Sequence, residues 1–125
     1  MFTSVGANAN QYGWLMRRAP SFMDVVCYTG NSATPRTITH NLGVAPELML
    51  IKSRSNTRGW AVYASAIGNN KYLILNGTNA ALTDTTIWVN TAPTSSVFTV
   101  GDPFDVGNIG IASFINCRMV YCKYG

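Results

Sequence analysis

The central stretch of the chain reads Thr37-Ile-Thr-His-Asn-Leu-Gly-Val-Ala-Pro-Glu-Leu-Met-Leu-Ile-Lys52, and it predicts a strand, a tight corner and a second strand. It opens on β-branched residues, which favour extended backbone. Gly43 can adopt a positive φ at the corner, and Pro46 accepts extended geometry without donating to a ladder. The apolar run from Leu48 to Ile51 suits a strand buried on both faces; a short helix has the same pattern, but the β-rich runs nearby favour the strand.

Other short β-patterned runs are separated by turns that contain Asn, Gly and Pro. The predicted strands cover residues 25–29, 36–40, 47–52, 59–64, 72–75, 87–89, 96–100, 109–114 and 118–122. This pattern predicts an all-β, single-domain β-sandwich, jelly-roll-like, of about eight or nine short antiparallel strands. We expect a flexible N-terminal lead over residues 1–11 and the sandwich domain over 12–125, with the best helical candidate a short turn near 12–18.

The composition is apolar and poor in charge, with 47% hydrophobic and 11% charged residues. Nine basic and five acidic side chains give a net charge of +4, but Arg17-Arg18 is the one adjacent basic pair. Scattered charges of this kind solubilise a surface and do not indicate a nucleic-acid partner. The polar start of the chain and the shortness of its apolar runs indicate neither a signal peptide nor membrane insertion.

The three cysteines, Cys27, Cys117 and Cys122, lack the spacing of a metal site. An odd number cannot pair completely within one chain, so a disulfide framework is not expected. We predict buried free thiols that act as small hydrophobic residues.

The sequence offers little for catalysis. His40 is the one histidine, no G-x-S-x-G elbow accompanies it, and we expect it to hydrogen-bond the turn that begins at Asn41. Asp102 and Asp105 lie three residues apart in a loop that is more typical of a turn than of a calcium site. Phosphate-cradling glycine motifs are absent. The sequence therefore predicts a protein that is not an enzyme and needs no cofactor or metal.

Aromatic and basic residues supply the ligand-binding candidates. Trp60 and Tyr63 can stack on sugar rings if they are exposed, and Arg54 and Arg58 flank the polar loop between two predicted strands. The alternative is that tryptophans inside strand-like runs, Trp60 and Trp88, are core residues of the sandwich.

The central stretch also resembles the T-x-x-H-N-L-G-x-x-P-E-L segment of an uncharacterised domain that recurs in tail-fibre and other virion-surface proteins of tailed bacteriophages, especially marine ones. The segment Tyr12–Gly30, with its Arg-Arg-Ala-Pro and Asp-Val-Val-Cys-Tyr-Thr-Gly, is similar to the opening of that domain. Later segments match in the same order: Arg58–Tyr63, Lys71–Asn76 and Trp88–Gly101. The resemblance covers roughly residues 12–114, and the end of the chain, 115–125, departs from the family pattern.

This resemblance implies a virion structural domain of the tail-fibre type, assembled in the host cytoplasm and engaged in host-surface recognition or adhesion. It implies a homo-oligomer, with a trimer favoured because tail fibres are usually trimeric, and a glycan or protein receptor on the host. Two alternatives stay open: a glycan-binding, lectin-like module and a capsid decoration protein.

Overall fold

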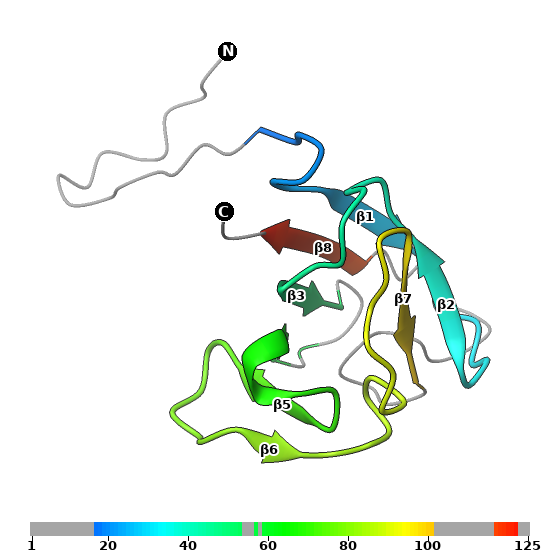
Figure 1. The fold of residues 1–125 in the computed structure, drawn as a ribbon. Helices are drawn as coiled ribbons and strands as arrows, with labels where there is room; N and C mark the ends of the chain where they lie inside the picture. Colours follow the sequence, from blue (N-terminus) through cyan, green and yellow to red (C-terminus); the bar gives the residue numbers. More distant parts are fainter. Residues whose placement is uncertain (1–16, 54–56, 58, 102–116, 123–125) are drawn as a thin grey trace, which may run out of the picture.

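The computed structural model describes residues 17–53, 57 and 59–101, and the backbone of 117–122. This part of the chain holds eight strands and one short 3-10 helix, η1 (Ser65–Ile67) (Figure 1). The strands are β1 (Val25–Tyr28), β2 (Arg36–Thr39), β3 (Leu48–Lys52), β4 (Ala61–Ala64), β5 (Lys71–Ile74), β6 (Leu82–Thr83), β7 (Val97–Val100) and β8 (Cys117–Cys122).

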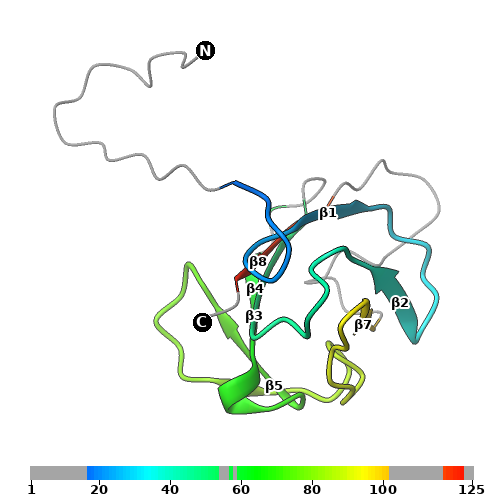
Figure 2. The ribbon, with the colours of Figure 1, turned by 45° about the horizontal axis from the view of Figure 1, so that its top comes forward.

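The strands form two antiparallel sheets. The large sheet has the order β1-β8-β3-β4-β5-β6, and β2 pairs with β7 in a small sheet. Figure 2 shows β2 and β7 on one side of the large sheet, so the two sheets form two layers. The predicted all-β sandwich is confirmed, with β8 from the end of the chain inserted between β1 and β3.

The core lies between the sheets and follows the two-residue alternation of the strands. On β3, Met49 and Ile51 point into the core, whereas Leu48 and Leu50 are half-buried on the opposite face. The prediction that this run is buried on both faces is therefore wrong, because the second layer covers one face of the large sheet. The core cluster contains Tyr28, Ile38, Leu42, Met49, Ile51, Ala61, Tyr63, Ile87, Trp88, Phe98 and Val100.

The corner after β2 has the predicted features. Gly43 has a φ of 80°, which a residue with a side chain rarely adopts, and Pro46 is fully buried beside the start of β3. Leu42 is also fully buried, so the corner is anchored in the core.

Several predicted elements differ from the structure. Residues 87–89 form turns and not a strand. Trp88 enters the core from this loop, and the loop hydrogen-bonds to neighbouring segments. The short β6 and η1 were not predicted. Residues 17 and 18 are not helical, and the rest of the helical candidate, 12–16, lies outside the described residues, as does the predicted strand 109–114.

The predicted burial of the free thiols is wrong for Cys27, which is exposed. Cys27 faces outward because its neighbours on β1, Val26 and Tyr28, pack on the core. The side chains of Cys117 and Cys122 lie outside the described part of the chain.

The outer face of the large sheet carries a cross-strand row of apolar residues. Leu50 is paired with Val62, and Val62 with Leu73. Val25 lies on the same line across the sheet, because Val25 on β1 and Leu50 on β3 both pair with position 120 of β8. We call these four residues, Val25, Leu50, Val62 and Leu73, the outer apolar row.

The turn after Trp88 holds backbone strain. Val89 and Asn90 have φ values of 51° and 45°, and the Thr91 N–H donates to the Trp88 carbonyl at 3.0 Å. Two successive positive φ angles are well tolerated by Asn and poorly by a β-branched residue. Val89→Asn is therefore expected to raise the free energy of unfolding by about 1 kcal/mol, measured by urea denaturation.

The matched control for this turn is Asn90→Val, at an exposed position. It places a second β-branched residue at positive φ and is expected to lower the free energy of unfolding by about 1–2 kcal/mol. Equal effects of the two substitutions would argue against strain as their cause.

Candidate functional site

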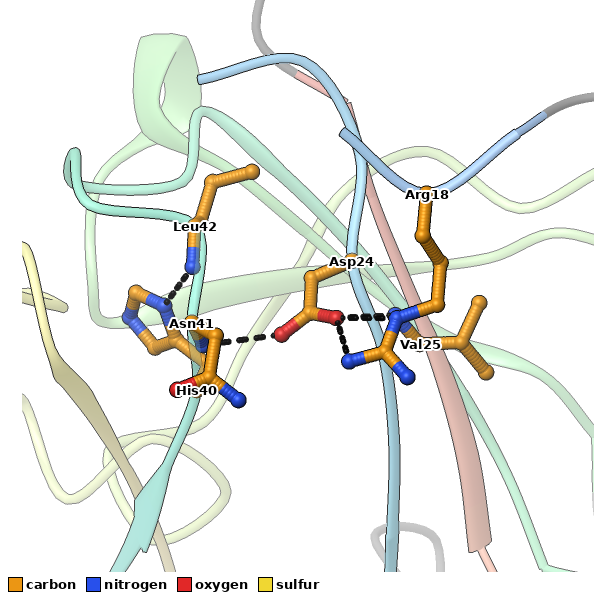
Figure 3. Close-up of polar contacts among 6 residues, drawn as sticks. All are labelled: Arg18, Asp24, Val25, His40, Asn41 and Leu42. Carbon is orange, nitrogen blue, oxygen red and sulfur yellow. Dashed lines mark hydrogen bonds and ion pairs between the residues drawn. The ribbon is translucent and has the colours of Figure 1, made fainter. Parts of the chain in front are cut away.

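The carboxylate of Asp24, just before β1, accepts hydrogen bonds from three residues (Figure 3). Its Oδ1 accepts hydrogen bonds from Arg18 Nε at 2.7 Å and from the Val25 N–H at 2.9 Å, and Arg18 Nη2 lies 2.5 Å away. Its Oδ2 accepts the Asn41 N–H at 2.8 Å. Asp24 thus joins the segment before β1 to the corner after β2.

The Asp24 carboxylate is held in its ionised form. Burial alone would raise its pKa, but hydrogen bonds from Asn41, Arg18 and Val25, together with the Arg18 charge, outweigh that effect and place the pKa below its ordinary value of 3.8. Asp24 is therefore a fixed negative charge that orients Arg18.

Arg18 and Asn41 lie on either side of Asp24 in Figure 3 and keep polar groups available. The Arg18 side chain is 58% exposed, whereas the Asp24 side chain is 4% exposed. Arg18 contacts Asp24 through Nε and Nη2, and its Nη1 has no hydrogen-bond partner among the described residues. Asn41 binds Asp24 through its backbone N–H, which leaves its exposed carboxamide unpaired among the described residues. Both residues line a cavity of about 170 Å³ together with Ala19, Pro20, Met23 and Asp24; we call it the Arg18 cavity.

His40 has the structural role that the sequence predicts. It is buried, and its Nδ1 accepts a hydrogen bond from the Leu42 N–H at 3.2 Å. Its Nε2 lies 3.1 Å from the Thr94 carbonyl oxygen. Because a carbonyl only accepts, Nε2 carries the proton, and the ring links the corner to the segment before β7.

A second depression, of about 430 Å³, lies between the corner and the loop before β7. It is lined by Val44, Ala45, Pro46, Glu47, Tyr63, Ser65, Ala92 and Pro93, and we call it the Tyr63 groove. The Tyr63 hydroxyl donates to Asn69 Oδ1 at 3.2 Å, and burial raises the Tyr63 pKa. The groove is mainly apolar, with Glu47 as its acidic group.

The structure separates the predicted ligand-binding residues. Tyr63 belongs to the core and is 3% exposed, whereas Trp60, just before β4, is half-buried and is not part of the core cluster. The two aromatic side chains therefore do not form one stacking surface. Arg54 and Arg58 lie outside the described residues, as do Asp102 and Asp105. The prediction that Trp88 is a core residue is confirmed.

The Asp24 cluster was missed by sequence reasoning. The sequence shows the basic pair Arg17-Arg18 and the turn residue Asn41, but the contact of Asn41 with Asp24 joins residues far apart along the chain. Within the described ranges, no group of three or more His, Cys, Asp or Glu side chains is placed to hold a metal ion. None of the described helical segments has the length and apolar character needed to cross a membrane.

The fold and these contacts define a small β-sandwich domain with a polar cluster at Asp24 that joins the segment before β1 to the β2–β3 corner. The chain belongs to the family described as a domain of unknown function, DUF7483, whose model matches residues 17–122. Searches of curated proteins and of solved structures gave no match.

Proposed function

We propose that this chain is a non-enzymatic structural domain of a tailed-phage virion, of the tail-fibre type, that assembles with copies of itself and presents a surface for recognition of the host. A trimer is the expected assembly. The proposal rests first on the ordered resemblance of residues 12–114 to virion-surface domains, described above from the sequence.

The structural observation that supports the proposal most is the outer apolar row. Val25, Leu50 and Leu73 are half-buried in the single chain, on the face of the large sheet turned away from β2 and β7. Three half-buried aliphatic side chains across the sheet, beside Val62, which is already buried, are a suitable contact for another copy, since association would remove their remaining exposed surface from water.

The edges of the large sheet add to this argument. Within the described residues, β1 pairs only with β8, and β6 only with β5. Open strand edges are sites where further strands add, and proteins cover them by closure or by assembly. A virion component assembled from several copies would cover both the row and the edges.

The test is the solution mass of the full chain by light scattering over a range of concentrations. The expected result is a stable assembly of three times the 13.6 kDa chain mass. Leu73→Lys is expected to dissociate it, because the substitution places a charge within the apolar row.

The matched control is Thr37→Lys, which adds the same charge at an exposed position of β2, on the small sheet. It is expected to leave the mass unchanged, and circular dichroism checks that both variants fold. A wild-type chain that stays monomeric at every concentration would contradict the proposal.

A lectin-like module is the second candidate, and the Tyr63 groove favours it. Its size lies within the range of small-molecule sites, and apolar walls with a few polar groups are typical of such sites. Tight binding of one defined sugar by a monomeric chain would favour this function. Binding to intact capsids and not to cells would instead indicate a capsid decoration protein.

A further inference from the structure

In the Arg18 cavity, the ion pair with Asp24 fixes the orientation of the Arg18 guanidinium. Two of its nitrogens, Nε and Nη2, face Asp24 Oδ1 at 2.7 and 2.5 Å. A guanidinium has five N–H donors in a planar fork, so Nη1 and the second hydrogen of Nη2 remain directed away from Asp24. An oriented arginine of this kind loses little side-chain freedom when it binds an oxyanion.

The N–H donors that the site leaves free favour an anion. Asp24 accepts from Arg18, Val25 and Asn41, so its oxygens are occupied and its charge is balanced by Arg18. Arg17 is exposed and outside the cavity lining, so its positive charge is largely screened at the site. The Tyr63 groove differs in this respect, because its charged lining residue is Glu47.

The remaining lining suits a sugar ring. Asn41 offers a carboxamide with both donor and acceptor atoms, which matches the hydroxyls of a saccharide. Ala19, Pro20 and Met23 supply apolar surface for the C–H face of a ring. The cavity, of about 170 Å³, is smaller than the sites typical of drug-sized ligands, so it suits one sugar and not a long oligosaccharide.

We propose that the Arg18 cavity binds a single sugar that carries a carboxylate, with Arg18 holding the carboxylate and Asn41 a ring hydroxyl. The ligand class rests on the proposed function, since acidic sugars would be met on the surface of a bacterial host. Asp24 is the positioning residue of this site, because its oxygens are already occupied by Arg18, Val25 and Asn41.

The test is titration of the full chain with glucuronic acid, followed by NMR, with glucose and acetate as comparison probes. Glucuronic acid is expected to bind at one site, and more tightly than either comparison probe. Arg18→Gln is expected to weaken binding by about tenfold or more, because the carboxylate loses its charged donor. Asn41→Ala, which keeps the backbone bond to Asp24, is expected to weaken binding by about threefold to tenfold.

The matched control is Arg17→Gln, which removes the same charge from the adjacent residue outside the cavity lining and is expected to change affinity by less than about threefold. Equal binding of glucose and glucuronic acid, equal binding of acetate, or full affinity in both Arg18→Gln and Asn41→Ala would overturn the inference. The binding test and the assembly test have separate outcomes. A chain that assembles but does not bind glucuronic acid contradicts only the proposed sugar site. A monomeric chain that binds glucuronic acid contradicts only the proposed virion assembly.

Discussion

Trp88→Ala is expected to lower the free energy of unfolding by about 4 kcal/mol, because it empties the largest buried position of the core. The Trp88 ring is 1% exposed and meets the Tyr63 ring edge to face, with centroids 5.6 Å apart and an interplanar angle of 78°. Its Nε1–H donates to the Lys71 carbonyl at 3.0 Å. A domain of this size has a total stability of about 5–15 kcal/mol, so the substitution removes between about a quarter and about four fifths of it.

The matched control is Trp88→Phe, which keeps an aromatic ring but removes the donor to Lys71. It is expected to cost about 2 kcal/mol, from one lost hydrogen bond and a smaller cavity. Urea denaturation followed by circular dichroism measures both variants without relying on tryptophan fluorescence. Equal losses would indicate that the Lys71 bond, and not the volume of the ring, determines the contribution of Trp88.

Trp88 also illustrates what the sequence could and could not predict. The strands around the central stretch were predicted closely, since β-branched residues and Gly43 give local signals at the right spacing. The run Ile87-Trp88-Val89 carries the same apolar signal but forms turns. Its conformation depends on contacts with Lys71 and Tyr63, which no local pattern reveals.

The candidate site was even harder to predict from the sequence, because it is formed by residues that are far apart along the chain. Asn41 was visible as part of the corner and Arg18 as half of a basic pair, but their meeting through Asp24 requires the corner to fold back on the segment before β1. Likewise, the insertion of β8 between β1 and β3 cannot be inferred from strand patterns, because many sandwich topologies share them.

Asp24→Ala is expected to lower the free energy of unfolding by about 3 kcal/mol, the second largest effect that we predict. The substitution leaves the partly buried N–H groups of Val25 and Asn41 without the acceptor that they share, and it also removes the ion pair with Arg18; each unsatisfied donor costs about 1–3 kcal/mol when buried and less when water reaches it. Arg18→Ala is the matched control and is expected to cost less than about 1 kcal/mol, since its side chain is largely exposed. A loss in Arg18→Ala as large as that in Asp24→Ala would contradict the view that the backbone donors dominate.

The pH dependence of stability tests the same cluster through the charge of Asp24. Because the folded pKa lies below the ordinary value of 3.8, the ionised carboxylate contributes its full stabilisation above that value and loses it as the pH falls through the lower folded pKa. Asp24→Asn keeps the shape of the side chain and cannot ionise. We therefore expect the wild type to exceed Asp24→Asn in free energy of unfolding at about pH 7, and the difference to shrink as the pH falls below 3.8, measured by urea denaturation. A difference that stays constant across this range would mean that Asp24 acts through its shape and not its charge, and the fixed orientation of Arg18 would then need another cause.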